Sequence, residues 1–353
     1  MNRFMTKACA ALLLLCLNPV TASIAKAEPT VAEIALLQGE QRQQRLIEGA
    51  RKERELNVYH VMPGIDMAPV IEAFTKKYGI AVKTWRSSSE LVLQRVVTEG
   101  RGGRFAVDII ENNGPEMEAL HREKMLQQVN SPTSTDIIPE AIPAHREWVG
   151  NTIDIFVQAY NTNLIKKEDL PKSYQELLDP KWKGRLGIEG ADQHWFALLA
   201  QELGQERATK LFRDIVDTNG ISVRSGHSLL ANLVASGEVP LALTVLNYTP
   251  PQLKQNGAPI ESFVMAPRIA YFRGIGVARK APHPYAAMLF YDFLQSDEGQ
   301  QILANRFKIP VSKKVGVFNE RSQLKFIDPK MFLDNNEKWI KTFEETITKR
   351  VRQ

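Results

Sequence analysis

Most of the chain alternates short apolar runs with stretches in which apolar residues recur every three or four positions. Runs of four to six residues rich in Val, Ile and Leu predict buried strands, and the longer periodic stretches predict amphipathic helices. Strand and helix follow one another repeatedly, which predicts an α/β fold with a largely parallel sheet. The five clearest strand-to-helix joints fall at residues 62–64, 86–89, 112–114, 190–192 and 225–227.

The loops at these joints are the first place to look for a binding site, because ligands of open α/β sheets bind beyond the carboxyl ends of the strands. Their hydroxyls and the free N–H groups at helix N-termini favour a carboxylate or a phosphate, and Arg86 and Arg224 end two of the strands. Ordinary helix capping explains any one loop taken alone, whereas the repetition favours ligand binding. The candidate ligand-binding residues are Arg86, Ser87, Ser88, Ser89, Asn112, Asn113, Asp192, His194, Trp195, Arg224, Ser225, Gly226, His227, Asn247 and Tyr248.

Some of these candidates have an equally good structural explanation. Trp195 continues the apolar face of its helix with Phe196 and Leu199, which is typical of core packing. His194 and His227 also suit helix caps or the surface. Arg273, in "YFRGIG", either reaches the ligand or lies on a surface loop.

The stretch "LALTVLNYTPPQ" (residues 241–252) predicts a buried strand that ends abruptly at Asn247 and Tyr248, before two prolines. A tyrosine at the end of such a strand suits hydrogen bonding to an organic solute or ring packing against it. Tyr248 is therefore a candidate contact.

The front of the chain predicts a secretory signal peptide over residues 1–27. Arg3 and Lys7 precede an apolar run at residues 8–17, and Ala25-Lys26-Ala27 offers a small-x-small cleavage site. The run is shorter than the ~20 residues that a spanning helix needs. We therefore expect a soluble, periplasmic mature protein.

Charge and cysteine content narrow the picture further. Removal of the signal peptide leaves 42 basic against 40 acidic residues, a balance that does not favour nucleic acid as a partner. Cys9 and Cys16 both lie in the signal peptide, so we expect neither a disulfide nor a cysteine-ligated metal in the mature chain.

Motifs of catalysis are missing from the sequence. It contains no P-loop, no G-x-S-x-G elbow and no H-E-x-x-H or other metal-ligand spacing among its six histidines. Ser225, His227 and Ser228 are close in sequence, but no oxyanion hole or orienting acid accompanies them. We expect no catalytic residue, no resident metal and no cofactor.

Two longer stretches, "PKSYQELLDPKWKGRLGI" (residues 171–188) and "APHPYAAMLFYDFLQSDEGQQIL" (residues 281–303), carry a family resemblance. With "YNTNLI" and "GEVPLALTV" they resemble the periplasmic solute-binding proteins of ABC importers, in the branch that includes ferric-iron-binding proteins. The resemblance implies a two-lobed type II fold with a ligand cleft between the lobes. It also implies an inner-membrane permease and a separate ATPase as partners.

The resemblance further implies a division of the chain. Residues 28–150 would form the first lobe with its N-terminal helix, and residues 151–250 the second. Residues 251–353 would return to the first lobe and pack C-terminal helices across both. Residues 154–163 and 241–248 are candidates for segments near the crossovers.

Ferric-binding relatives characteristically hold iron with two adjacent tyrosines, whose phenolates suit a hard cation. The eight tyrosines of this chain include no adjacent pair, and the matching region offers only Tyr248. The preferred hypothesis is therefore a monomeric transport protein for a small organic solute with a carboxylate or phosphate-like group. A ferric-iron carrier is the main alternative, and a secreted hydrolase is a further one.

Overall fold

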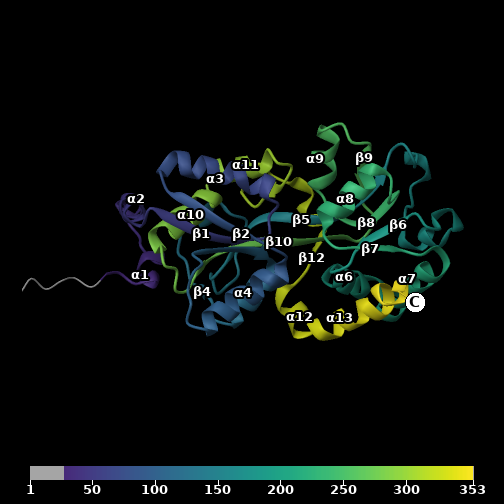
Figure 1. Ribbon diagram of the computed structural model, residues 1–353, viewed down its shortest axis with the longest axis horizontal. Helices are drawn as coiled ribbons and strands as arrows, with labels where there is room; N and C mark the ends of the chain where they lie inside the picture. The colour runs from purple at the N-terminus through teal and green to yellow at the C-terminus, as the bar shows by residue number, and fades with distance from the viewer. Residues whose placement is uncertain (1–27, 353) are drawn as a thin grey trace, which may run out of the picture.

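The computed structural model describes residues 28–352, so the predicted signal peptide lies outside the described residues. Two lobes lie side by side along one path of hydrogen-bonded strands, in the order β2-β1-β3-β10-β5-β8-β6-β7 (Figure 1). The first four of these strands and the first half of β5 belong to the first lobe. The second half of β5 and the remaining strands belong to the second lobe.

Parallel strands form the centre of the first lobe, with helices on both faces. Figure 1 shows α3, α10 and α11 above the sheet and α4 below it. The strands are β1 (Glu55–His60), β2 (Ala81–Arg86), β3 (Ile109–Asn113) and the short β4 (Leu126–Gln127), β11 (Ile309–Pro310) and β12 (Leu324–Phe326). The helices are α1 (Val31–Ala35), α2 (Arg42–Glu53), α3 (Gly64–Tyr78), α4 (Ser89–Arg101), α5 (Gly114–Arg122), α10 (Pro284–Gln295) and α11 (Asp297–Ala304).

The second lobe is smaller and is built in the same way. Strand β6 runs parallel to both of its neighbours, β7 and β8. The strands are β6 (Leu186–Glu189), β7 (Ser222–Arg224), β8 (Leu241–Leu246) and β9 (Ile260–Phe263). The helices are α6 (Gln193–Leu203), α7 (Gln205–Asn219), α8 (His227–Ser236) and α9 (Thr249–Gln255).

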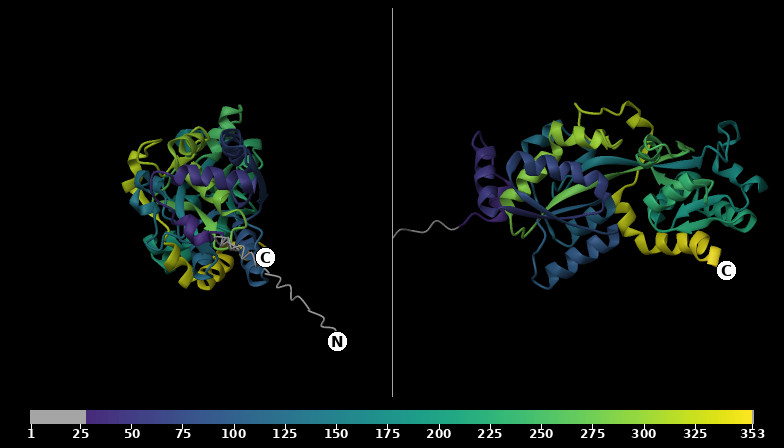
Figure 2. Two further views of the ribbon diagram at one scale, coloured as in Figure 1. Left: turned by 90° about the vertical axis from the view of Figure 1, so that its left-hand side faces the viewer. Right: turned by 45° about the horizontal axis from the view of Figure 1, so that its top comes forward.

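Three segments connect the lobes. The long strand β5 (Val149–Asn161) pairs with β10 (Arg268–Ala278) over its first half and with β8 and β9 over its second half. Strand β10 then pairs with β3 in the first lobe. Near the C-terminus, α12 (Pro329–Asp334) packs on α5 and α13 (Asn336–Phe343) packs on α6, and Figure 2 shows this segment running from one lobe to the other.

The periodicities seen in the sequence explain why these elements form. Helix α10 buries the apolar face that contains Ala287, Phe290 and Phe293. Ser296 caps the next helix by accepting the N–H of Gly299, with Asp297 and Glu298 in the first turn. Helices α10 and α11 therefore serve packing.

Candidate functional site

The carboxyl ends of the parallel strands in both lobes point to the lobe junction, the region where β5 and β10 pass from one lobe to the other. Asn113, at the end of β3, pairs with Arg273 in the middle of β10. Leu246, at the end of β8, pairs with Phe156 in the middle of β5. The loops that follow these strands therefore face one another across the lobe junction.

Three side chains from two loops of the second lobe meet there, and we call Glu189, Asp192 and His227 the Asp192 cluster. One possible ligand atom from each lies within 4.8 Å of those of the other two. Asp192 is 1% exposed, makes no capping bond to α6, and leaves both carboxylate oxygens without a hydrogen-bond partner. Such a buried bare carboxylate is costly unless something positive or hydrogen-donating pairs with it.

Backbone amides fix the second carboxylate of the cluster, that of Glu189. Glu189 accepts the N–H of Ala191 at 2.6 Å and that of Gly226 at 2.9 Å, so that it links the two loops. Gly226 has a φ of 99°, a left-handed conformation that side chains rarely adopt, and this turn directs its N–H to the carboxylate. Glu189 was missed in the sequence, although it ends the strand that enters the loop.

The charges of the cluster depend on one another. Burial alone would lower the pKa of His227, but Asp192, 3.3 Å from its Nε2, and Glu189 raise that pKa to about 9. Burial raises the pKa of Glu189, and the neighbouring charge of Asp192 adds to the rise. With no ligand bound, the imidazolium of His227 is thus the nearest positive charge to the two carboxylates.

Aromatic rings enclose the cluster on the side of the crossing strands. His194 is buried, its Nε2 has no hydrogen-bond partner, and burial lowers its pKa. Its ring packs edge-on against Phe156 and Tyr271, with centroids 5.5 and 5.7 Å away. Phe156 also lies 5.9 Å from the ring of His227.

The loops of the first lobe also contain buried oxygen atoms without hydrogen-bond partners. Asn112 holds its loop by donating to the Ser89 carbonyl and accepting the N–H of Asn113. The Oδ1 of Asn113 and the Oε2 of Glu116 are buried without a partner. Burial and the nearby charge of Glu90 raise the pKa of Glu116 to about 8. The negative charge of Glu90, a residue of the first lobe, also opposes the lowering of the pKa of His194 in the second lobe.

The arginines expected to bind an anion are engaged elsewhere or already neutralised. Arg86 is exposed and donates to the Met62 carbonyl, and Arg224 pairs with Glu238 at 3.0 Å. Arg273 is buried at the junction rather than on a surface loop, 2.6 Å from Asp154 and 3.6 Å from Glu111. Two carboxylates thus balance its charge.

Tyr248 is buried among charged side chains at the junction. The Nζ of Lys308 lies 3.1 Å from the centroid of its ring and 3.4 Å from Asp66. Burial lowers the pKa of Lys308 to about 8, and burial raises the pKa of Tyr248. Ring packing is one of the two roles predicted for Tyr248. In the structure the group that packs on its ring is Lys308 of the same chain.

The remaining candidates fall outside the meeting point of the loops. Trp195 is 1% exposed and packed against Tyr174 and Phe212, as its alternative explanation as a core residue predicts. Asn247 accepts the N–H of Ile155 and so ties β8 to the crossing strand. Two serines stabilise the backbone near their loop: the N–H of Ser87 donates to the His60 carbonyl, and the side chain of Ser88 caps α4. Ser225 is exposed.

A second group of possible metal ligands, Glu118, His121 and His145, has its hydrogen bonds satisfied internally. The backbone N–H of Glu147 donates to Nδ1 of His145, so Nε2 carries the proton and donates to Glu118 at 3.1 Å. His121 pairs with the Glu147 carboxylate. This group therefore lacks the bare atoms that distinguish the Asp192 cluster.

Comparison with known proteins identifies the class. A family model described as "Bacterial extracellular solute-binding protein" matches residues 107–335, and the chain belongs to this family. Its members are binding proteins for transport rather than enzymes, which removes the hydrolase alternative. No helix within residues 28–352 is long and apolar enough to cross a membrane.

Individual relatives point to the ferric-binding branch. The chain is 26% identical to the "Fe(3+)-binding periplasmic protein" of Serratia marcescens over 246 residues, which are 66% of this chain and 71% of the relative. It is 25% identical to "Iron uptake protein A1" of Synechocystis sp. over 293 residues, 76% and 81% of the two chains. The resemblance predicted from the sequence is thereby confirmed.

Solved structures confirm the two-lobed type II fold. Iron-bound HitA from Pseudomonas aeruginosa matches with a TM-score of 0.72 at 23% identity, over 83% of this chain and 99% of that one. AfuA from Actinobacillus pleuropneumoniae, with fructose-6-phosphate bound, matches with a TM-score of 0.73 at 22% identity, over 83% and 98%. At such identities the likeness establishes the fold, not the ligand.

Proposed function

We propose that this protein is the periplasmic substrate-binding component of an ABC importer. It captures a solute at the lobe junction and delivers it to an inner-membrane permease that a separate ATPase drives. Membership of the solute-binding family and the periplasmic names of the relatives support this role. The chain itself carries out no chemistry on its cargo.

We further propose that the cargo is a metal cation, held by Glu189, Asp192 and His227. The observation that carries this proposal is Asp192, a buried carboxylate without a hydrogen-bond partner, whose ion-pair partner His227, 3.3 Å away, is itself one of two further possible ligands. A cation that takes the place of the His227 proton would balance the two carboxylates. Carboxylate oxygen and imidazole nitrogen are ordinary ligands of such ions.

An anionic organic cargo is less well supported by the side chains at the junction. Asp192 and Asn113 present buried acceptor atoms without hydrogen-bond partners there, and these atoms would repel or leave unsatisfied a carboxylate or a phosphate. The sequence suggested an anion because it shows the hydroxyls and arginines of the loops without their partners.

Ferric iron is one member of the proposed class, and two relatives carry iron in their names. The tyrosine pair of ferric-binding relatives is absent here, so carboxylates would supply the hard oxygen ligands. Three protein groups do not complete a coordination shell. Water or a small anion would fill the remaining positions.

The direct test is metal binding by the mature protein after removal of metals with a chelator. Thermal unfolding and calorimetric titration with ferric citrate, Mn²⁺ and Zn²⁺ should show stabilisation by at least one ion. Asp192→Asn and His227→Asn should each weaken that binding by about tenfold or more. His121→Asn is the matched control and should bind as the wild type does.

Native mass spectrometry of the protein as purified provides an independent check, because it reports the mass of any retained cargo. Stabilisation by sugar phosphates but by no metal, unchanged in Asp192→Asn, would refute the cation proposal and leave the transport role intact. Failure of every small solute to bind would count against the transport role itself.

A further inference from the structure

A pocket of about 190 Å³ opens in the first lobe, at the end remote from the lobe junction. It lies beside the start of β3, where Val107 lines it, and the end of β10, where Ala278 lines it. The lobe junction lies further along both strands, where Asn113 at the end of β3 pairs with Arg273 in the middle of β10. The pocket is thus separate from the proposed cargo site.

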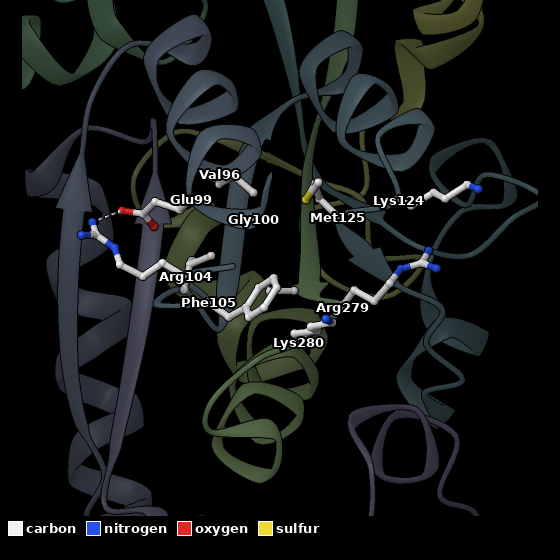
Figure 3. Close-up of a pocket in the computed structure, with 11 residues that line it drawn as sticks. Val96, Glu99, Gly100, Arg104, Phe105, Lys124, Met125, Arg279 and Lys280 are labelled. Carbon is white, nitrogen blue, oxygen red and sulfur yellow. Dashed lines mark hydrogen bonds and ion pairs between the residues drawn. The ribbon is translucent and has the colours of Figure 1, made fainter. Parts of the chain in front are cut away.

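Apolar groups from four segments form the walls. Val96 comes from α4, Phe105 from the loop before β3, Met125 from the turn after α5, and Ala278 from β10. Phe105 is 38% exposed, unlike the buried phenylalanines of the core. Figure 3 shows the Phe105 ring and the Met125 side chain on two sides of the space. For scale, an engineered cavity of about 150 Å³ accommodates benzene.

Glycine contributes to the width of the pocket. A Cβ on Gly100 would lie 2.7 Å from the Sδ of Met125, so any side chain there would push Met125. The absence of a side chain at this position leaves room between α4 and the Met125 turn.

The rim is basic, and two of its charges have no carboxylate partner. Arg104 pairs with Glu99 at 2.8 Å and Arg279 with Glu147 at 3.2 Å. Lys124 and Lys280 form no ion pair with any described residue, and the Nζ of Lys280 lies 4.5 Å from the centroid of Phe105. Glu99, the one carboxylate of the lining, is shared by Arg95 and Arg104.

We propose that this pocket is a second binding site, which takes a small amphiphilic anion with an aromatic or branched apolar body and a carboxylate. The apolar body lies between Phe105 and Met125, and the carboxylate pairs with Lys280, which lies beside the Phe105 ring. Lys124, whose side chain points away from this space in Figure 3, adds positive charge to the rim. The charge complementarity favours this occupant over a neutral ligand, because both lysines lack a partner of their own.

The test compares how tightly the full mature protein binds three probes, which carry both parts of the proposed ligand or only one of them. 3-Phenylpropionate carries both body and charge, 3-phenyl-1-propanol carries the body alone, and acetate carries the charge alone. NMR titration should detect 3-phenylpropionate at millimolar or lower concentration and at least about tenfold tighter than either other probe. Its shifts should include Phe105 and Met125, and added salt should weaken binding.

Variants complete the test. Lys280→Glu combined with Lys124→Glu should weaken 3-phenylpropionate binding by about tenfold or more, and Phe105→Ala should weaken all binding of the aromatic body. Lys338→Glu is the matched control, since Lys338 also lies over an aromatic ring, Trp339, at 4.8 Å but lines no such pocket. Equal binding of the alcohol, or shifts confined to the loops at the lobe junction, would overturn the proposal. A metal ion at the Asp192 cluster should not compete.

Discussion

The side chain of Glu116 should stay protonated near neutral pH in the folded protein. Its Oε2 is buried without a hydrogen-bond partner, and burial with the nearby charge of Glu90 raises its pKa to about 8 despite the opposing charge of Arg273. The unfolded chain releases this proton near pH 4.5. Between these two values the folded state binds more protons than the unfolded state, so this residue lowers stability as pH rises.

Glu116→Gln removes that dependence. The variant should match the wild type near pH 4.5 and exceed its free energy of unfolding by about 1–2 kcal/mol at pH 8, less than the full shift implies because the residue is only half-buried. Urea unfolding at both pH values measures the difference. Glu72→Gln, at an exposed position on α3, is the control. A gain for Glu116→Gln that is the same at both pH values would contradict the argument.

Tyr248 should not act as a phenolate ligand. Burial raises its pKa, and the ammonium of Lys308 lies over its ring. Ferric citrate should therefore produce no visible phenolate-to-iron absorbance band, and Tyr248→Phe should change metal affinity by less than about threefold. A band that appears with ferric iron and disappears in Tyr248→Phe would show that the tyrosine does bind the ion.

At the scale of single residues, the strand-to-helix loops could be predicted from the sequence, but the hydrogen bonds and ion pairs of their side chains could not. Asp192, His194 and His227 were among the predicted residues because strand-to-helix loops are recognisable locally. Whether a loop attracts an anion or a cation depends on which groups are already paired. The pairing of Arg224 with Glu238, or of Arg273 with Asp154, arises only when the chain is folded.

At the scale of the elements, β10 is closely packed at Gly274. A Cβ on Gly274 would lie 2.8 Å from Trp148 and 3.1 Å from Met117, both buried. Gly274→Ala should lower the free energy of unfolding by about 1–3 kcal/mol, because overpacking forces these neighbours to move. Chemical denaturation measures the loss.

Gly64→Ala is the matched control, since nothing lies within 4 Å of a Cβ there and the residue opens α3. Alanine is the better helix former, so this variant should be as stable as the wild type or more stable by up to about 1 kcal/mol. If Gly274→Ala were equally stable, the close packing on β10 would not be the reason for its glycine.

Most helices and strands were predictable because their periodicity is local. The stretch "ELNVYHV" became β1 and "SLLANLVASG" became α8 within a few residues. Strand β10 was missed, and its "YFRGIG" was read only as a possible loop. Its partners Asn113 and Thr152 lie far away in the sequence, so nothing near Arg273 signals the strand.

In the molecule as a whole, the lobes touch beyond the crossing strands. Gln252 in α9 of the second lobe donates to Asp66 in α3 at 2.9 Å and to the Arg306 carbonyl at 2.8 Å, both in the first lobe. Binding proteins of this kind close about hinge segments when ligand binds, and we expect the bonds of Gln252 to stabilise the closed arrangement. We therefore expect Gln252 to support cargo binding without touching the cargo.

Gln252→Ala should weaken metal binding by about three- to tenfold, because each lost hydrogen bond contributes roughly 0.5–1.5 kcal/mol to the closed arrangement while the Asp192 cluster is left intact. Calorimetric titration measures the affinity, and small-angle scattering should show a less complete compaction on adding metal. Gln301→Ala is the control, since Gln301 bonds only to Asn305 within the first lobe. Equal affinities for wild type and Gln252→Ala, or an equal loss in Gln301→Ala, would mean that the bonds of Gln252 do not govern closure.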